Sequence, residues 1–123
     1  MNFEEYQKQA MRTNDGKCTD RLRLAANCTA ADFGAVINAS LGLSGEVGEL
    51  NDMIKKAVFH GHPLNTEHLE KEIGDIMWYV AMMCDSFGFD MAVIAQMNID
   101  KLKARYPEGF DTERSLHRQE GDI

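Results

Sequence analysis

Two short stretches of the chain carry pairs of acidic residues with the same spacing and a glycine between them. Glu46-Val47-Gly48-Glu49-Leu50 reappears almost unchanged as Glu72-Ile73-Gly74-Asp75-Ile76. Helical residues three apart lie about 5–6 Å apart at Cβ, which suits carboxylates that bridge metal ions ~3.5–4 Å apart. If two helices bring the copies together, the chain has one metal site with four ligands: Glu46, Glu49, Glu72 and Asp75.

The charge of such a site indicates the kind of ion. Two unit charges ~4 Å apart repel each other by about 4 kcal/mol at an effective dielectric near 20. Four gathered carboxylates must therefore raise some of their pKa values or take up a divalent cation. Because the ligands are all oxygens, with no nearby Cys or His expected, we predict Mg²⁺, with Mn²⁺ as a substitute.

Gly48 and Gly74 occupy the same place in the two motifs. Glycine inside a helix costs roughly 0.5–1 kcal/mol relative to alanine. We expect the missing side chain to let a second helix or a ligand approach closely. The alternative is that each acidic pair is part of a solvated helix face, which is the usual setting of a single such pair. Two matched copies beside apolar residues favour the metal site.

The elements that must position these acids are helices, since helical periodicity dominates and no convincing strand alternation is present. We predict helices from Asn2 to about Thr13, from a Thr29–Asp32 cap to about Val58, from Glu67 to Phe87, and from an Asp90 cap to about Arg105. Asn65 or Thr66 is the expected cap of the third helix, and Gly88 its expected left-handed end. Short connections predict an all-α bundle of four main helices with antiparallel neighbours.

The second and third helices each carry an apolar stripe with spacings of four and three alternately. In the second helix it consists of Val36, Ser40, Leu43, Val47, Leu50, Ile54 and Ala57, and in the third of Leu69, Ile73, Ile76, Val80, Met83 and Phe87. Each acid immediately precedes a stripe residue, so it is expected ~100° from the stripe centre, at its border.

Length and composition limit the remaining possibilities. A chain of 123 residues fits one domain, with residues 1–28 as a less certain helical region and 111–123 as a loose polar tail. A core this small would gain from burial against a second copy. The net charge of -7 disfavours nonspecific nucleic-acid binding. A polar N-terminus, no apolar run near ~20 residues and three widely spaced cysteines predict a cytoplasmic protein with no membrane partner.

Basic and aromatic residues provide candidates for substrate binding. Asn98, Lys101 and Arg105 share a helix face and suit a polyphosphate. Lys56, with its neighbour Lys55, is a second candidate for phosphate contact, although lysines are common at helix C-termini. Trp78 either stacks on a base or packs within the protein. His60 and His62 lie on a Gly/Pro turn, where histidines are more often incidental than ligands.

Three stretches together resemble a known family: GLSGEVGEL at 42–50, KEIGDIMWYVA at 71–81 and NIDKLKARYPEGF at 98–110. They are similar to the MazG-type, all-α nucleoside triphosphate pyrophosphohydrolases over roughly residues 39–110. The resemblance implies a helical bundle that assembles as a homodimer or homotetramer, with Mg²⁺ bound by the four acids. It also implies cleavage of a nucleoside triphosphate between the α and β phosphates, giving a monophosphate and pyrophosphate.

Within that reaction, we expect Glu49 to position the attacking water, and Lys101 and Arg105 to hold the leaving phosphates. Family members often open the first motif with a Glu-Glu pair, whereas this chain has Gly45 at the first position. Alternatives are a nonenzymatic helical module that dimerises or binds a partner, and a related pyrophosphohydrolase acting on phosphoribosyl-ATP. A di-iron carboxylate oxidase is remote because the helices lack Glu-x-x-His motifs. The base and sugar of the substrate stay open.

Overall fold

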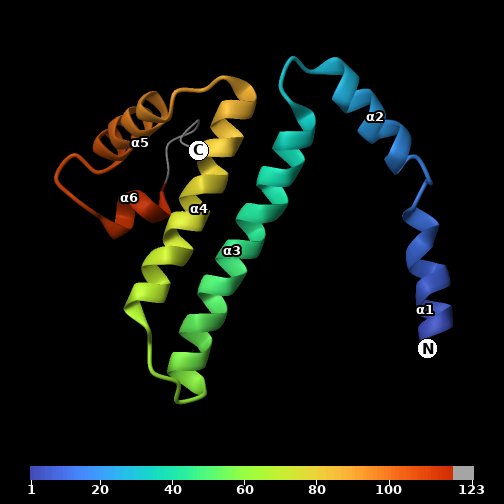
Figure 1. Ribbon diagram of the computed structural model, residues 1–123, viewed down its shortest axis with the longest axis horizontal. Helices are drawn as coiled ribbons and strands as arrows, with labels where there is room; N and C mark the ends of the chain where they lie inside the picture. Colours follow the sequence, from blue (N-terminus) through green and yellow to red (C-terminus); the bar gives the residue numbers. More distant parts are fainter. Residues whose placement is uncertain (118–123) are drawn as a thin grey trace. The chain divides into compact units, whose positions relative to one another are not determined.

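The computed structural model describes residues 1–117, and all regular structure in that range is helical. This confirms the predicted all-α class. The elements in chain order are α1 (Phe3–Ala10), the 3-10 helix η1 (Met11–Thr13), α2 (Cys18–Cys28), α3 (Phe33–Phe59), α4 (Thr66–Phe87), α5 (Met91–Arg105) and α6 (Thr112–Leu116) (Figure 1). The chain divides into two compact units, Met1–Phe87 and Gly88–Ile123. A single domain over residues 1–123 stays a prediction.

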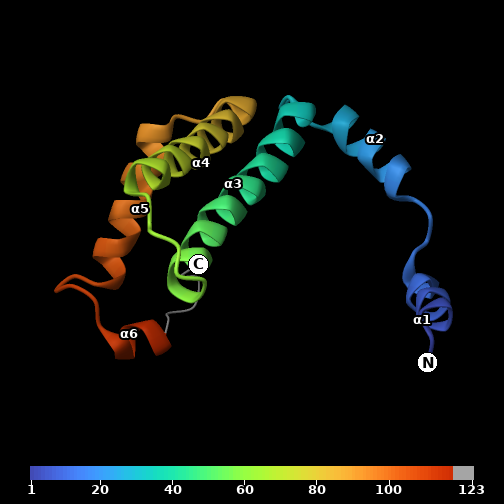
Figure 2. The same ribbon diagram turned by 60° about the horizontal axis from the view of Figure 1, so that its bottom comes forward.

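In the first unit, the long helices α3 and α4 lie side by side and are joined by the short loop 60–65 (Figures 1 and 2). At one end, the backbone N–H of Asp32 donates to the carbonyl of Ser86 at 3.2 Å. Further along, the side-chain amide of Asn38 approaches the sulfur of Met82 at 3.7 Å. Residue numbers therefore rise on α3 as they fall on α4, so the neighbours are antiparallel as predicted.

Side-chain caps determine where these helices begin. The Asp32 carboxylate accepts from the backbone N–H of Ala35 at 3.1 Å, so α3 starts at Phe33. The predicted role for Thr29 in this cap is wrong, because its hydroxyl oxygen accepts from Ala31 N–H at 3.2 Å, ahead of the helix. Side-chain oxygens compete for nearby N–H groups, and here Asp32 is the one placed for the first turn.

The other predicted caps are present. Asn65 accepts from the backbone N–H of His68 at 3.0 Å, ahead of α4. Asp90 accepts from Ala92 N–H at 2.7 Å at the start of α5. Gly88, after the end of α4, has a φ of 68°, a conformation that glycine adopts without the steric cost of a Cβ.

The residues buried between α3 and α4 are displaced from the predicted stripes. We call these buried and half-buried residues the inner seam; they are Ala39, Leu43, Glu46, Leu50, Met53 and Ala57 of α3, and Leu69, Glu72, Ile76, Tyr79, Met83 and Ser86 of α4. About half of each predicted stripe lies on this seam. The prediction that the acids stand at the border is wrong for Glu72, which is buried within the seam, and agrees with the half-buried Glu46.

Apart from the half-buried Val36, the remaining stripe residues are exposed, and their large members are Val47, Ile54, Ile73, Val80 and Phe87. Small residues account for the displacement, since Ala39 is fully buried and the Tyr79 ring lies directly against Gly42. Close approach on this side of α3 turns the neighbouring apolar side chains away from α4. As a result, the fully buried apolar residues of the described chain are only Ala39 and Cys84.

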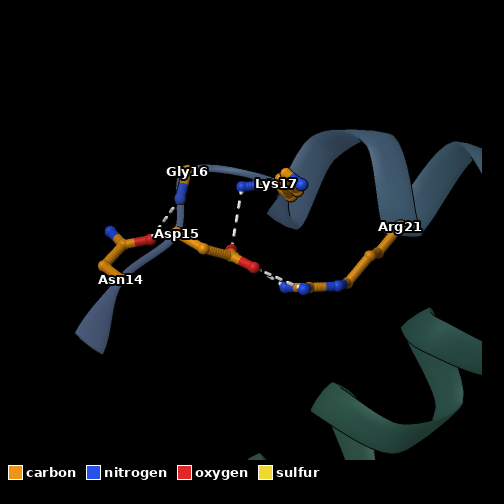
Figure 3. Close-up of polar contacts among 5 residues, drawn as sticks. All are labelled: Asn14, Asp15, Gly16, Lys17 and Arg21. Atoms are coloured by element: carbon orange, nitrogen blue, oxygen red, sulfur yellow. Dashed lines mark hydrogen bonds and ion pairs between the residues drawn. The ribbon is translucent and has the colours of Figure 1, made fainter.

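Residues 14–28, for which no separate helix was predicted, form a turn followed by α2 (Figure 3). The Asp15 carboxylate accepts from the Arg21 guanidinium and from the backbone N–H of Lys17, the latter at 3.1 Å (Figure 3). The Arg21 contact, with the Lys17 bond, lowers the pKa of Asp15. Asn14 accepts from Gly16 N–H at 3.0 Å, where Gly16 has a φ of 70°. These bonds set the turn that starts α2.

The second unit contains α5 and α6. Helix α5 ends at Arg105, just before Pro107, as predicted. The tail was expected to be loose from residue 111, but Asp111 accepts from Arg114 N–H at 2.8 Å and starts the short helix α6. Residues 118–123 of the predicted tail lie outside the described residues.

Among residues 1–117, none of the helices is by itself both long and apolar enough to cross a membrane. Only the pair α4 and α5, taken together across their break, reaches that length and composition.

Candidate metal centre

Three of the four predicted metal ligands come together on the inner seam or at its edge. Glu46 of α3 and Glu72 and Asp75 of α4 each offer a carboxylate oxygen, and these oxygens lie within 4.8 Å of one another. Glu46 is half-buried, Glu72 is buried and Asp75 is exposed. The antiparallel register produces this arrangement, since it places the first motif opposite the second.

Glu72 distinguishes the cluster from an ordinary acidic surface. Glu72 is only 6% exposed. One oxygen, Oε1, lies 2.8 Å from Nε2 of His68, whereas the buried Oε2 has no hydrogen-bond partner. A buried polar atom without a partner costs about 1–3 kcal/mol, and more when it is charged. A cation held by the cluster would provide the missing partner.

The electrostatics of Glu46 point the same way. Burial raises the pKa of Glu46, and the negative charges of Glu49, Asp75 and Glu72 raise it further. The cluster therefore holds more negative charge than its surroundings compensate. Oxygen-only ligands with excess negative charge fit a hard divalent cation such as Mg²⁺.

Glu49, the fourth predicted ligand, stands outside this three-residue cluster. It lines an open hollow of about 440 Å³ beside the cluster, and residues of both α3 and α4 border this hollow. The other residues lining the hollow are Gly45, Gly48, Asp52, Met53, Lys56, His68 and Glu72. Glu49 is close enough for its charge to act on Glu46. Its roles as a ligand and in catalysis stay predictions.

The motif glycines do not serve close packing between helices of this chain. A Cβ built on Gly48 or Gly74 would have no neighbouring atom of the described chain within 4 Å. Gly42 is the glycine that permits close approach, because a Cβ there would lie 2.1 Å from the Tyr79 ring. The expectation that Gly48 and Gly74 let a second helix approach is therefore wrong for helices of the same chain. The open space beside these glycines leaves room for a ligand.

Lys56 lies where the hollow meets the last turns of α3. Its ammonium contacts Asp52 Oδ2 at 2.6 Å, and Lys55 contacts the other oxygen, Oδ1, at 2.5 Å. Hydrogen bonds from Lys55 and Lys56 lower the pKa of Asp52 to about 2. Lys56 borders the hollow as a phosphate-binding residue would, but it is already paired.

The other predicted substrate residues are on α4 and α5. Asn98, Lys101 and Arg105 are on α5 in the second unit, where the Arg105 guanidinium lies 5.9 Å from the Tyr106 ring centroid. Trp78 is 57% exposed and meets Tyr79 edge-on, with ring centroids 5.0 Å apart. His60 and His62 follow the end of α3, and neither belongs to the acidic cluster of the described residues.

The sequence interpretation missed His68 and expected no histidine near the acids. The signal was available, since His68 precedes Glu72 by four residues on one helix, and side chains at that spacing are neighbours.

Comparison with known proteins bears on this site. Residues 37–110 match the MazG nucleotide pyrophosphohydrolase domain. The chain belongs to this family. The MazG match includes both acidic motifs, α4 and α5, and so confirms the family expected from the sequence.

Among curated proteins, the Gene 37 protein of Mycobacterium phage L5 is 32% identical over 74 residues, which cover 57% of this chain and 65% of that protein. The chain thus matches somewhat under two thirds of this relative's length. No solved structure matches the chain significantly.

Proposed function

We propose that the chain is a Mg²⁺-dependent pyrophosphohydrolase that cleaves a ribo- or deoxyribonucleoside triphosphate between its α and β phosphates. The products are a nucleoside monophosphate and pyrophosphate. The observation that carries the proposal is the buried, unpartnered Oε2 of Glu72, which lies in a three-carboxylate cluster of a MazG-family chain.

The chemistry supplied by bound Mg²⁺ is neutralisation of the triphosphate's negative charge and of the charge that develops on the leaving group. Glu46, Glu72 and Asp75 would hold the ion, and Glu49 would be a fourth ligand if its side chain turned from the hollow toward them. The Glu49 carboxylate accepts a hydrogen bond from the attacking water. The water oxygen then bonds to the α-phosphorus. At the same time the bond between the α-phosphorus and the oxygen that bridges to the β-phosphorus breaks, and pyrophosphate leaves with that oxygen.

Residues beyond the acids bind the rest of the nucleotide in this proposal. Lys56 has the best structural support, since it borders the same hollow as Glu49 and Glu72. Asn98, Lys101 and Arg105 are proposed for the phosphates on the strength of their shared face on α5. Trp78 is proposed for the base because most of its surface is available.

We also propose that the protein is a homodimer or homotetramer. Exposed apolar side chains support this, since Val47, Ile73 and Val80 are 39%, 45% and 38% exposed. Fully burying an exposed side chain of this kind is worth roughly 1.5–3 kcal/mol, and about two fifths of that gain is left at each of these part-exposed residues. Light scattering coupled to size exclusion should give twice or four times the 13.8 kDa of one chain. A cytoplasmic location stays a prediction.

The deciding experiment incubates the protein with a panel of ribo- and deoxyribonucleoside triphosphates and Mg²⁺, and measures pyrophosphate and monophosphate. We expect both products in equal amounts, and none after chelation of the metal. Glu49→Gln should abolish turnover while the far-ultraviolet circular dichroism stays unchanged. Phosphoribosyl-ATP belongs in the panel because its turnover would identify the related activity.

Two results would overturn the proposal. Release of inorganic phosphate instead of pyrophosphate would show a different bond being cleaved. No turnover of any nucleotide, together with a stable oligomer that ignores Mg²⁺, would favour the nonenzymatic module.

A further inference from the structure

The two oxygens of the Glu72 carboxylate have different surroundings. Oε1 lies 2.8 Å from His68 Nε2, within ion-pair distance, and Oε2 is buried without a hydrogen-bond partner. His68 lies one turn before Glu72 on the same side of α4. The same place on α3, one turn before Glu46, holds Gly42, where the Tyr79 ring fills the space. Only the Glu72 side of the cluster therefore has a donor one turn away.

We propose that His68 is a positioning residue for the metal centre: its Nε2–H fixes Oε1 of Glu72 and so leaves Oε2 for the cation. This inference rests on the proposed function, because it assigns Glu72 as a ligand. A carboxylate held at one oxygen loses the freedom to rotate and enters the site with its free oxygen already placed. Mutating a residue that hydrogen-bonds a metal ligand typically weakens metal affinity 10–100-fold.

The setting of His68 favours this role over a purely structural one. Its side chain is 56% exposed and borders the hollow, so it contributes little to a core. Glu72, by contrast, has a side chain only 8% exposed. His68 is half-exposed and contacts the buried carboxylate of Glu72, so its effect is to orient that carboxylate.

The test measures Mn²⁺ binding to the full chain by electron paramagnetic resonance of the free ion, without nucleotide. His68→Leu removes the donor, and we expect 10–100-fold weaker Mn²⁺ binding. His68→Gln carries an amide nitrogen in place of Nε2 and should stay within about threefold of wild type. His68→Asn carries its amide nearer the backbone, in the place of Nδ1, and should resemble His68→Leu. His62→Leu, a turn histidine outside the cluster, is the matched control and should bind normally.

The outcomes separate the two proposals. If the wild-type protein binds no Mn²⁺, the metal centre itself fails. If wild type binds Mn²⁺ and His68→Leu binds equally well, only the role of His68 fails. Equal loss in the Gln and Asn variants would also overturn it, since rescue should depend on where the donor lies. Melting temperatures of the metal-free variants, expected to differ little, identify any loss caused by unfolding.

Discussion

The two acidic motifs are near copies in sequence, yet they have different surroundings in the molecule. In both, the first acid lies on the inner seam and the second is exposed, with Glu46 and Glu72 inside and Glu49 and Asp75 outside. One turn earlier, however, α3 has Gly42 and α4 has His68. On α3 the Tyr79 ring lies against Gly42, and on α4 the His68 ring contacts the Glu72 carboxylate.

The difference shows that a motif's chemistry depends on residues one helical turn away. Glu72 is more deeply buried than Glu46, and it is the acid with both a donor and an unpartnered oxygen. Glu46 shares its seam but keeps contact with solvent. We therefore expect the second motif to contribute more to cation binding than the first. The first experiment below tests that ranking, and the next three test the helix contact, the motif glycines and the lysine-paired acid near the two motifs.

The largest effect is expected from removing charge at the buried acid. Glu72→Gln should weaken Mn²⁺ binding by about 100-fold or more, since loss of an outer partner alone costs 10–100-fold. It should also raise the melting temperature of the metal-free protein, because repulsion within the cluster falls. Glu46→Gln should give the smaller rise, since Glu46 is less buried. Calorimetry measures both quantities, and Glu70→Gln, an exposed acid of α4, is the control.

A smaller effect is expected where α3 and α4 touch. Gly42→Ala places a Cβ 2.1 Å from the Tyr79 ring, so the ring or the helix must move. Overpacking of this kind typically costs about 1–3 kcal/mol. Urea unfolding should show that loss in the free energy of unfolding. An unchanged midpoint would mean that Tyr79 does not lie against Gly42.

The motif glycines should respond in the opposite direction. Gly48→Ala and Gly74→Ala meet no atom of the described chain, so each should stabilise the helix by roughly 0.5–1 kcal/mol. Turnover lost from a stabilised variant would show that a ligand uses the open space. Destabilisation in both variants would instead indicate that a second copy packs there.

The smallest effect concerns the acid that contacts two lysines. The pKa of Asp52 is lowered to about 2 by hydrogen bonds from Lys55 and Lys56. A lowered carboxyl pKa stabilises the fold above the unfolded value of ~3.9, and that contribution is lost as the pH falls toward 2. Carbon-detected NMR should find the Asp52 midpoint near 2, moving upward in Lys55→Met and Lys56→Met. A wild-type midpoint near 4 would contradict the pairing.

Much of the fold was predictable because it follows from local patterns. The helical periods, the caps at Asn65 and Asp90, the left-handed Gly88 and the end of α5 before Pro107 all depend on nearby residues. The face of contact was not predictable in the same way. Apolar periodicity indicated Val47 and Ile73, whereas the seam uses Glu46 and Glu72, because close approach at small residues outweighed the count of apolar side chains.

The site shows the same division. Spacing identified the acids, and three of them meet. Sequence spacing could not give the unequal burial of Glu46 and Glu72, nor place Glu49 beside the cluster and not within it. Those details depend on the angle at which α3 and α4 face each other, and the sequence of either helix alone does not determine that angle.

The contact of Tyr79 with Gly42 has one more consequence. Gly42 precedes Glu46 by one turn, and Tyr79 follows Asp75 by one turn, so an aromatic plug sits next to the carboxylates in an antiparallel pair. A slip of one helix along the other moves every opposing pair by about 5.4 Å per turn. Such a slip would move the Tyr79 ring away from Gly42 and against a bulkier side chain, and it would separate the carboxylates of the two helices. The contact of Tyr79 with Gly42 therefore fixes the register of the two helices, and the approach of the three carboxylates depends on that register.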